Sequence, residues 1–222
     1  MSWVTTFLNS SIGKKSIMAI TGLLLCIYLI VHLAGNLLLF AGPETFNGYV
    51  AALTSFKPFV RFIEVILTIL FLSHILLSVK LTKENRNATS QKYTVNDPSQ
   101  NSSLFSRNMG FTGSILFIFL VTHLSTIWYQ FQTNHDEGNF FEIVVGDAVG
   151  FGNIYVTILY IVAMVLLGAH LRHGFQSAFQ SFGIRHNKYG GLIEKVGVLF
   201  WLIIPAGFLS IAVYFGLLGG AG

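Results

Sequence analysis

The sequence predicts an all-α integral membrane protein with five transmembrane helices and a cytoplasmic N-terminus. Hydrophobic residues make up 53% of the chain and charged residues only 10%, whereas soluble domains carry about 25% charged residues. Five apolar runs are long enough to cross a bilayer, which takes roughly 20 residues of helix. The basic residues gather in alternate connections between these runs, and this asymmetry orients the chain.

The predicted spans cover about residues 16–40, 60–81, 109–131, 154–174 and 196–218. The first is too long for the apolar region of a signal peptide, and no small-residue cleavage site follows it. The polar segment 82–106 reads as a connecting loop, so we expect residues 1–222 to form a single transmembrane domain. Pro205 predicts a kink in the fifth span, which closes the bundle.

The distribution of Lys and Arg predicts the topology. Eleven of the thirteen precede the first span or lie in the second and fourth connections and the helix ends that flank them, and only Lys57 and Arg61 lie on the other side. Cytoplasmic segments carry an excess of Lys and Arg. The N-terminus is therefore expected in the cytoplasm and the C-terminus outside. The net charge of +4 follows from this asymmetry and indicates no nucleic-acid partner.

A repeat links the first and third spans. Residues 18–33 and 109–124 lie 91 positions apart and are identical at eight of sixteen positions. Both copies hold a glycine followed ten residues later by a histidine: Gly22 and His32, Gly113 and His123. Each glycine could make room for a flat macrocycle or for a neighbouring helix.

Four histidines lie inside apolar runs, one in each of the first four spans: His32, His74, His123 and His170. Along helices that rise 1.5 Å per residue, His32 and His123 lie about 12 Å below the outer ends of their spans. His74 and His170 lie about 21 and 24 Å below theirs. Two pairs at two depths suit two stacked bis-histidine haems, because haem iron takes two axial ligands and a four-helix interior can supply them. Cys26 is the only cysteine, so each haem would be held non-covalently, as haem b.

Other uses of these histidines remain open. A lone histidine in a membrane helix can simply hydrogen-bond a neighbouring helix. A zinc site is disfavoured because the levels differ by about 10 Å and no Cys or carboxylate joins either pair. A haem-free histidine-based transporter would usually bring carboxylates into helix centres, but the only candidate, Glu64, lies near the outer end of the second span.

The chain resembles a known family of membrane cytochromes over nearly its whole length. The supporting stretches are Ser10–Gly22, His32–Tyr49, Ser106–His123 and Gly168–Gly183. They are similar to the membrane-anchor cytochrome b subunit of succinate dehydrogenase and fumarate reductase, of the b558 type with one five-helix polypeptide and two haems b. An alternative is the cytochrome b subunit of another respiratory dehydrogenase.

The resemblance implies partners and a reaction. A flavoprotein subunit with FAD would interconvert succinate and fumarate, and an iron–sulfur subunit would carry electrons to the membrane. This chain would pass them between that subunit and a quinone, with menaquinone expected, in the bacterial cytoplasmic membrane. The resemblance also implies that His74 and His170 hold the proximal haem, and His32 and His123 the distal one.

Further site residues follow from this resemblance. The glycine that follows the family's helix IV ligand is Gly174 here, which favours His170 over His173. Some relatives carry a glutamate for proton transfer where this chain has Gly168, so we expect no such route. Glu44, after the first span, is the candidate for proton exchange with the quinone, and Glu64 is the alternative. The basic candidates for the haem propionates are Lys80, Arg172 and Arg185 at the inner level and Arg61 at the outer level.

Overall fold

The computed structural model describes residues 2–88, 102–133 and 138–220, and every regular element within them is a helix. Five helical stretches are long and apolar enough to cross a membrane: Ser11–Ala41, Lys57–Asn87, Met109–Thr133, Ile154–Ser181 and Asn187–Leu217. The expected all-α fold with five membrane spans is confirmed. Lys92, His135 and the middle of the polar segment 82–106 lie outside the described residues.

The spans are built from helices joined by short irregular turns. The first half of the chain forms α1 (Trp3–Asn9), α2 (Ser11–Leu37), the 3₁₀ turn η1 (Leu38–Ala41), α3 (Pro43–Ser55) and α4 (Lys57–Asn87). The third span and its flanks comprise α6 (Leu104–Arg107), α7 (Met109–His123), the π turn η2 (Leu124–Trp128), α8 (Tyr129–Thr133) and α9 (Phe140–Val145). The rest forms α10 (Ile154–Ser181), α11 (Asn187–Val198), the π turn η3 (Leu199–Ile203) and α12 (Ile204–Leu217).

Several helices extend beyond the apolar runs because polar residues cap or continue them. The Ser10 hydroxyl accepts a hydrogen bond from the Gly13 amide at 3.0 Å, so α2 begins five residues before the predicted span. Asn153 caps α10 in the same way through the Tyr155 amide at 3.0 Å. Pro58 lies in the first turn of α4, where its missing N–H costs no helical hydrogen bond.

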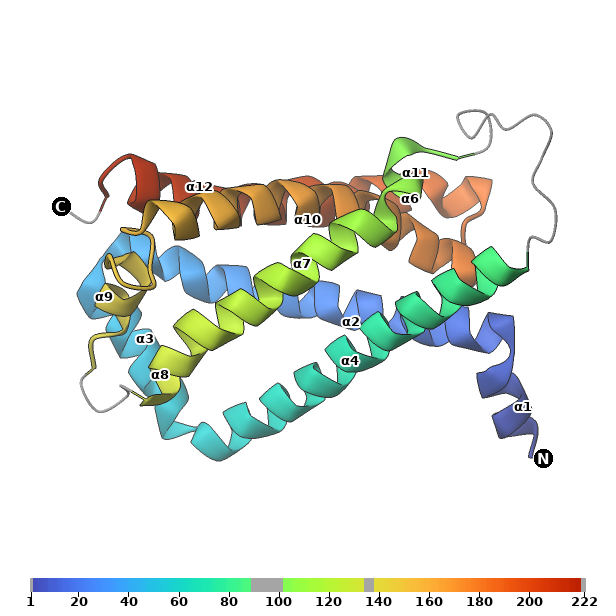
Figure 1. Cartoon of the computed structure of the whole chain (residues 1–222), viewed down its shortest axis with the longest axis horizontal. Helices are drawn as coiled ribbons and strands as arrows, with labels where there is room; N and C mark the ends of the chain where they lie inside the picture. The colour runs from blue at the N-terminus through green and yellow to red at the C-terminus, as the bar shows by residue number, and fades with distance from the viewer. Residues whose placement is uncertain (1, 89–101, 134–137, 221–222) are drawn as a thin grey trace.

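The five spans run along the long axis of the molecule, with the two termini at opposite ends (Figure 1). Helices α2 and α10 pack against each other and against α12, whereas α4 packs mainly on α2 and α7 mainly on α10. Among the described residues, α4 buries only Leu81 and α7 only Thr112. The tightly packed core therefore lies between α2, α10 and α12, with α4 and α7 laid against it.

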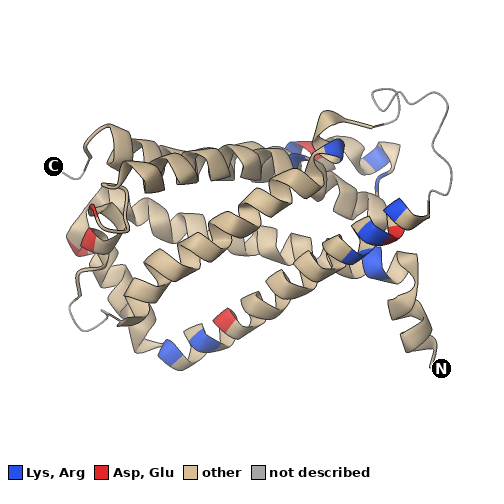
Figure 2. Ribbon diagram, in the orientation of Figure 1, with Lys and Arg blue, Asp and Glu red and all other residues tan. Residues whose placement is uncertain are grey.

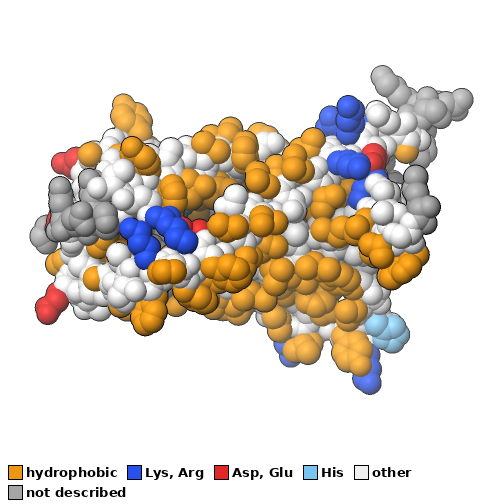
Figure 3. All heavy atoms as spheres, turned by 90° about the horizontal axis from the view of Figure 1, so that it is seen from below, with side chains coloured by type: hydrophobic (Ala, Val, Ile, Leu, Met, Phe, Trp, Pro, Cys, Tyr) orange, Lys and Arg blue, Asp and Glu red, His pale blue; other side chains and the backbone are white. Residues whose placement is uncertain are grey.

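Charged residues distinguish the two ends of the bundle. Figure 2 shows Lys and Arg gathered at the end that holds α1, the C-terminal part of α4 and the start of α11, which we call the basic end. The opposite end, which holds α3 and α9, is called the far end. Between them the surface seen from below is mostly hydrophobic, as lipid contact requires (Figure 3). One basic residue, Lys14, is only 7% exposed, and its ammonium contacts the Glu84 carboxylate at 2.5 Å, which ties α2 to α4.

The connections at the far end are more ordered than the sequence indicates. The segment after the first span forms α3, and Phe46 and Val50 are buried there. Helix α9 buries Phe140 and Phe141 in the same cluster as Phe46. Apolar residues in these connections thus cap the far end of the bundle.

The fifth span is interrupted next to its proline. The π turn η3 ends at Ile203, directly before α12, and Pro205 lies in the first turn of α12. Proline removes a backbone donor and disturbs the hydrogen bonds of the preceding turn. The structure therefore places the irregularity where Pro205 predicts one.

Candidate functional site

The structure brings His32 of α2 and His123 of α7 together in the half of the bundle nearer the far end. Their ring centroids lie 5.9 Å apart and their planes differ by 79°. Phe119 stacks on His123 with centroids 5.8 Å apart, and Phe208 of α12 lies 5.5 Å from His32. This far-end pair is therefore enclosed by aromatic side chains, one of them from the fifth span.

The Nδ1 atom of each far-end histidine contacts a polar side chain. The Tyr160 hydroxyl lies 2.8 Å from His123 Nδ1. The Tyr28 hydroxyl and the Asn36 amide nitrogen each lie 3.4 Å from His32 Nδ1, and the Tyr28 ring stacks on this imidazole. A tyrosine hydroxyl can accept the Nδ1 proton of its histidine, and an imidazole in that tautomer has its Nε2 lone pair available for a metal.

The second pair, His74 and His170, lies in the half nearer the basic end. The two imidazoles are close enough to interact electrostatically. Thr21 Oγ1 lies 3.2 Å from His74 Nδ1, and Thr112 Oγ1 lies 3.3 Å from His170 Nδ1. Both threonines are 5% exposed, so these hydroxyls are buried polar groups whose side-chain partner is the imidazole.

The repeated glycines lie against this basic-end pair. A Cβ atom added to Gly22 would stand 3.2 Å from His74 Cε1, and one added to Gly113 would stand 3.4 Å from His170 Cε1. Each glycine therefore lets the imidazole of the next helix approach its own helix closely. Whether the glycines also contact a haem stays a prediction.

The separation of the far-end pair fits the ligand set of a haem. Metal–imidazole bonds are about 2 Å long, so two imidazoles on opposite sides of one iron stand with centroids roughly 6 Å apart. The far-end pair matches this separation. In the described part of the chain no three His, Cys, Asp or Glu side chains gather as a metal site. Two protein ligands are what a bis-histidine haem takes, since the macrocycle supplies the other four.

A π turn follows the far-end ligand candidate on α7. Leu124–Trp128 forms this turn directly after His123, and no proline accompanies it. Single π turns inside helices occur often at functional sites. No feature of the sequence predicts this π turn, because the repeat with the first span ends at Leu124.

A polar cluster lies near the far-end pair. The Arg61 guanidinium contacts Glu64 Oε2 at 2.6 Å and also hydrogen-bonds the Gln132 side chain. The Trp128 indole donates to Glu64 Oε1 at 2.9 Å, and Tyr28, which stacks on His32, lies within electrostatic range of Glu64. We call Arg61, Glu64, Trp128 and Gln132 the far-end polar cluster.

The two candidates for proton exchange differ in their surroundings. Glu44 lies in the first turn of α3, is exposed, and makes no hydrogen bond or ion pair with any described residue. Glu64 is half-buried, contacts Arg61 and accepts a hydrogen bond from the Trp128 indole of η2. Of the two carboxylates, only Glu64 has side-chain partners among the described residues.

The basic candidates for the propionates also differ. The Arg172 guanidinium lies between two aromatic rings, 4.5 Å from Phe105 and 5.1 Å from Trp201. Lys80 and Arg185 are exposed near the basic end, and Arg61 is engaged in the far-end polar cluster. Nothing in the described contacts assigns a propionate partner among them.

Gly168 has a packing reason to be glycine. A Cβ atom there would stand 2.8 Å from the Trp201 carbonyl oxygen of η3. A glutamate at this position could not be accommodated without separating α10 from η3. The absence of a carboxylate route at this place stays a prediction.

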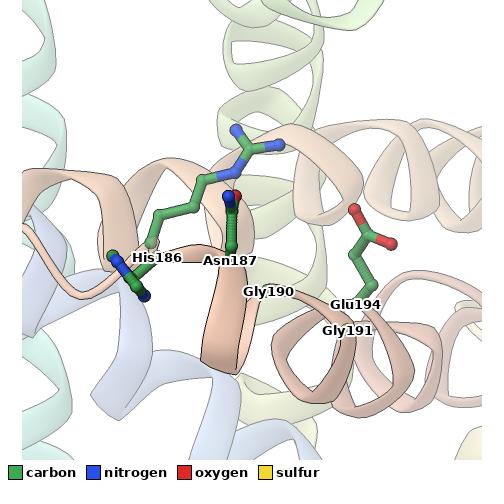
Figure 4. A pocket seen from close by; sticks show the side chains of 6 residues that line it. His186, Asn187, Gly190, Gly191 and Glu194 are labelled. Atoms are coloured by element: carbon green, nitrogen blue, oxygen red, sulfur yellow. The ribbon is translucent and has the colours of Figure 1, made fainter.

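A pocket of about 480 Å³ opens at the basic end, where α10 passes into α11. Its lining consists of Arg185, His186, Asn187, Gly190, Gly191 and Glu194. Asn187 and Glu194 project to the same side in Figure 4, while the His186 imidazole lies apart from them. His186 Nδ1 accepts a hydrogen bond from the Lys188 amide at 3.2 Å, so this histidine caps α11. The pocket lies at the opposite end of the bundle from His32 and His123, and none of the four paired histidines lines it.

No protein-family model, no curated protein and no solved structure matches this chain.

Proposed function

We propose that the chain is the di-haem b membrane-anchor subunit of a succinate:quinone oxidoreductase in the bacterial cytoplasmic membrane. The observation that carries the proposal is the arrangement of four histidines in two pairs, with each Nδ1 engaged by a hydroxyl or amide. His32 and His123 would hold one haem, and His74 and His170 the other. When bound, each haem supplies one-electron oxidation and reduction.

In this proposal the residues of the chain would keep water away from the haems and set their depths in the membrane. Aromatic side chains around His32 and His123 exclude water from the far-end pair, and the two pairs lie at successive depths in the bundle. The charge asymmetry favours a cytoplasmic basic end, where the iron–sulfur and FAD-containing flavoprotein subunits would attach. Electrons would then cross from the basic end toward the far end.

Quinone chemistry, with menaquinone the expected quinone, fits the far end. Reduction of a quinone consumes two protons for two electrons, so the site needs an acid–base group. Glu44 and Glu64 remain the candidates, and the contacts of Glu64 with Arg61 and Trp128 favour Glu64.

The spectrum of the purified protein tests the proposal. We expect a reduced α-band of b-type haem and two haems per chain. Replacing His32 or His123 by Ala should remove one haem and spare the other, and His74→Ala or His170→Ala should remove the second. His186→Asn is the matched control, since Asn can still cap α11 and should leave both haems in place.

The outcomes separate the alternatives. Absence of b-type haem in the wild-type protein would contradict the di-haem proposal and favour the alternative of a haem-free histidine-based transporter. Two haems with co-purified subunits of a hydrogenase or formate dehydrogenase would instead identify the anchor of another respiratory enzyme. Loss of the same haem in His32→Ala and His74→Ala would show that the pairing is wrong.

A further inference from the structure

The hydroxyl groups of Thr21 and Thr112 lie within hydrogen-bond distance of backbone carbonyl groups of their own helices. Thr21 Oγ1 lies 3.0 Å from the carbonyl oxygens of both Ile17 and Met18. Thr112 Oγ1 lies 3.2 Å from the Met109 carbonyl oxygen. A hydroxyl has a single hydrogen and two lone pairs. A hydroxyl that donates its hydrogen to one of these carbonyl oxygens has only acceptor capacity left for the nearby imidazole.

In this arrangement the histidine is the donor in each contact. His74 Nδ1 and His170 Nδ1 lie 3.2 and 3.3 Å from these hydroxyl oxygens, so each Nδ1 carries the proton. A neutral imidazole with a proton on Nδ1 has its lone pair on Nε2. That tautomer is the one that a metal-binding Nε2 requires.

We propose that Thr21 and Thr112 are positioning residues that fix His74 and His170 in the metal-binding tautomer and orientation. The inference rests on the proposed di-haem function. Each threonine is followed by a glycine, Gly22 or Gly113, against which the same imidazole packs. The two Thr–Gly pairs thus form matching cradles, one on α2 for the histidine of α4 and one on α7 for the histidine of α10.

Helices α2 and α7 each contribute residues to both histidine pairs. Each helix carries its own histidine for the far-end pair and, eleven residues earlier (32 − 21 and 123 − 112), the threonine that serves the basic-end pair. Eleven residues correspond to roughly 16 Å of helix. Changes at the threonines should therefore act on the haem of His74 and His170 and leave the other unaffected.

The physical effect of the threonine is on ligand strength. A histidine that donates its second N–H to an acceptor becomes a more basic ligand. A more basic ligand stabilises the oxidised iron, so removal of the acceptor should raise the midpoint potential of the haem between His74 and His170. Its occupancy should also fall, because the imidazole can then rotate or change tautomer.

The test compares Val and Ser variants in the intact, purified complex by redox titration and haem quantification. Thr21→Val and Thr112→Val keep the shape of the side chain without the acceptor, and Thr21→Ser and Thr112→Ser keep the hydroxyl. In each Val variant we expect an upward shift in the potential of one haem, or loss of that haem. The other haem should be unchanged, and the Ser variants should resemble the wild type.

Several results would overturn the inference. These are unchanged potentials and occupancies in both Val variants, equal shifts of both haems, or Ser variants that behave like Val variants. A Val variant that fails to accumulate while its Ser counterpart accumulates without haem would also contradict it, because the defect would then lie in folding. Wild-type complex that lacks b-type haem would instead refute the proposed function, so the two failures are distinguishable.

Discussion

At the scale of single residues, Glu64 shows what sequence reasoning can and cannot find. The sequence placed Glu44 near the far-end haem because it follows the first span by a few residues. It could not show that Trp128 and Gln132, more than 60 positions away, converge on Arg61 and Glu64. Such contacts depend on how α4 crosses the end of the third span. The histidines, by contrast, could be paired by depth, since a helix rises regularly along its axis.

Glu64→Gln and Glu44→Gln test which carboxylate serves the quinone. Removal of a general acid–base group typically lowers a rate by about 10²–10⁴-fold. We expect Glu64→Gln to lower succinate:quinone reductase activity at least about ten-fold, with succinate oxidation by an artificial acceptor unchanged. The assay compares both activities in the same purified complex.

The reverse result is equally informative. A large loss in Glu44→Gln with normal activity in Glu64→Gln would assign the role to the exposed carboxylate of α3. Arg61→Gln serves as a companion variant, because it removes the ion pair but leaves the carboxylate of Glu64.

At the scale of elements, close contacts between helices depend on residues without side chains. Helix α10 meets η3 at Gly168, and α12 meets α10 at Gly216, where an added Cβ would stand 2.2 Å from Thr157 Oγ1. Small residues at such crossings are typical of membrane helices. The sequence singled out Gly168 only as the place of a glutamate in some relatives, and it indicated no packing role for Gly168 or Gly216. Pro205 predicted an irregularity in the fifth span, whereas nothing predicted the π turn after His123.

Gly168→Ala tests the crossing of α10 and η3. The new methyl group would lie 2.8 Å from the Trp201 carbonyl oxygen, so the helices must shift apart. Overpacking of this kind typically costs about 1–3 kcal/mol. We expect a lower midpoint of thermal unfolding in detergent. Gly190→Ala on α11 is the control, because an added Cβ there meets no atom within 4 Å. Equal midpoints for the two variants would show that this contact does not limit packing.

At the scale of the whole molecule, hydropathy predicted the five spans because each must match the thickness of the bilayer. It could not predict that α4 and α7 lie outside the tightly packed core, since lipid-facing and interior faces are equally apolar. Nor could it predict the cap made by α3 and α9, whose apolar residues sit in short segments between spans. Which helices form the core depends on contacts between specific side chains, and the amino-acid composition of each span does not reveal these contacts.

Topology is the remaining property of the whole molecule, and thiol labelling tests it. The only native cysteine, Cys26, is 4% exposed, so its background reaction with a membrane-impermeant reagent should be low. Thr45→Cys places an exposed thiol on α3 at the far end, and Tyr189→Cys places one on α11 at the basic end, where the native side chain is 47% exposed. Because Lys and Arg gather at the basic end, we expect Thr45→Cys to be labelled in intact cells or spheroplasts. Tyr189→Cys should be labelled only after permeabilisation. The opposite labelling pattern would mean that the far-end polar cluster lies on the cytoplasmic side, which would contradict the proposed direction of electron transfer.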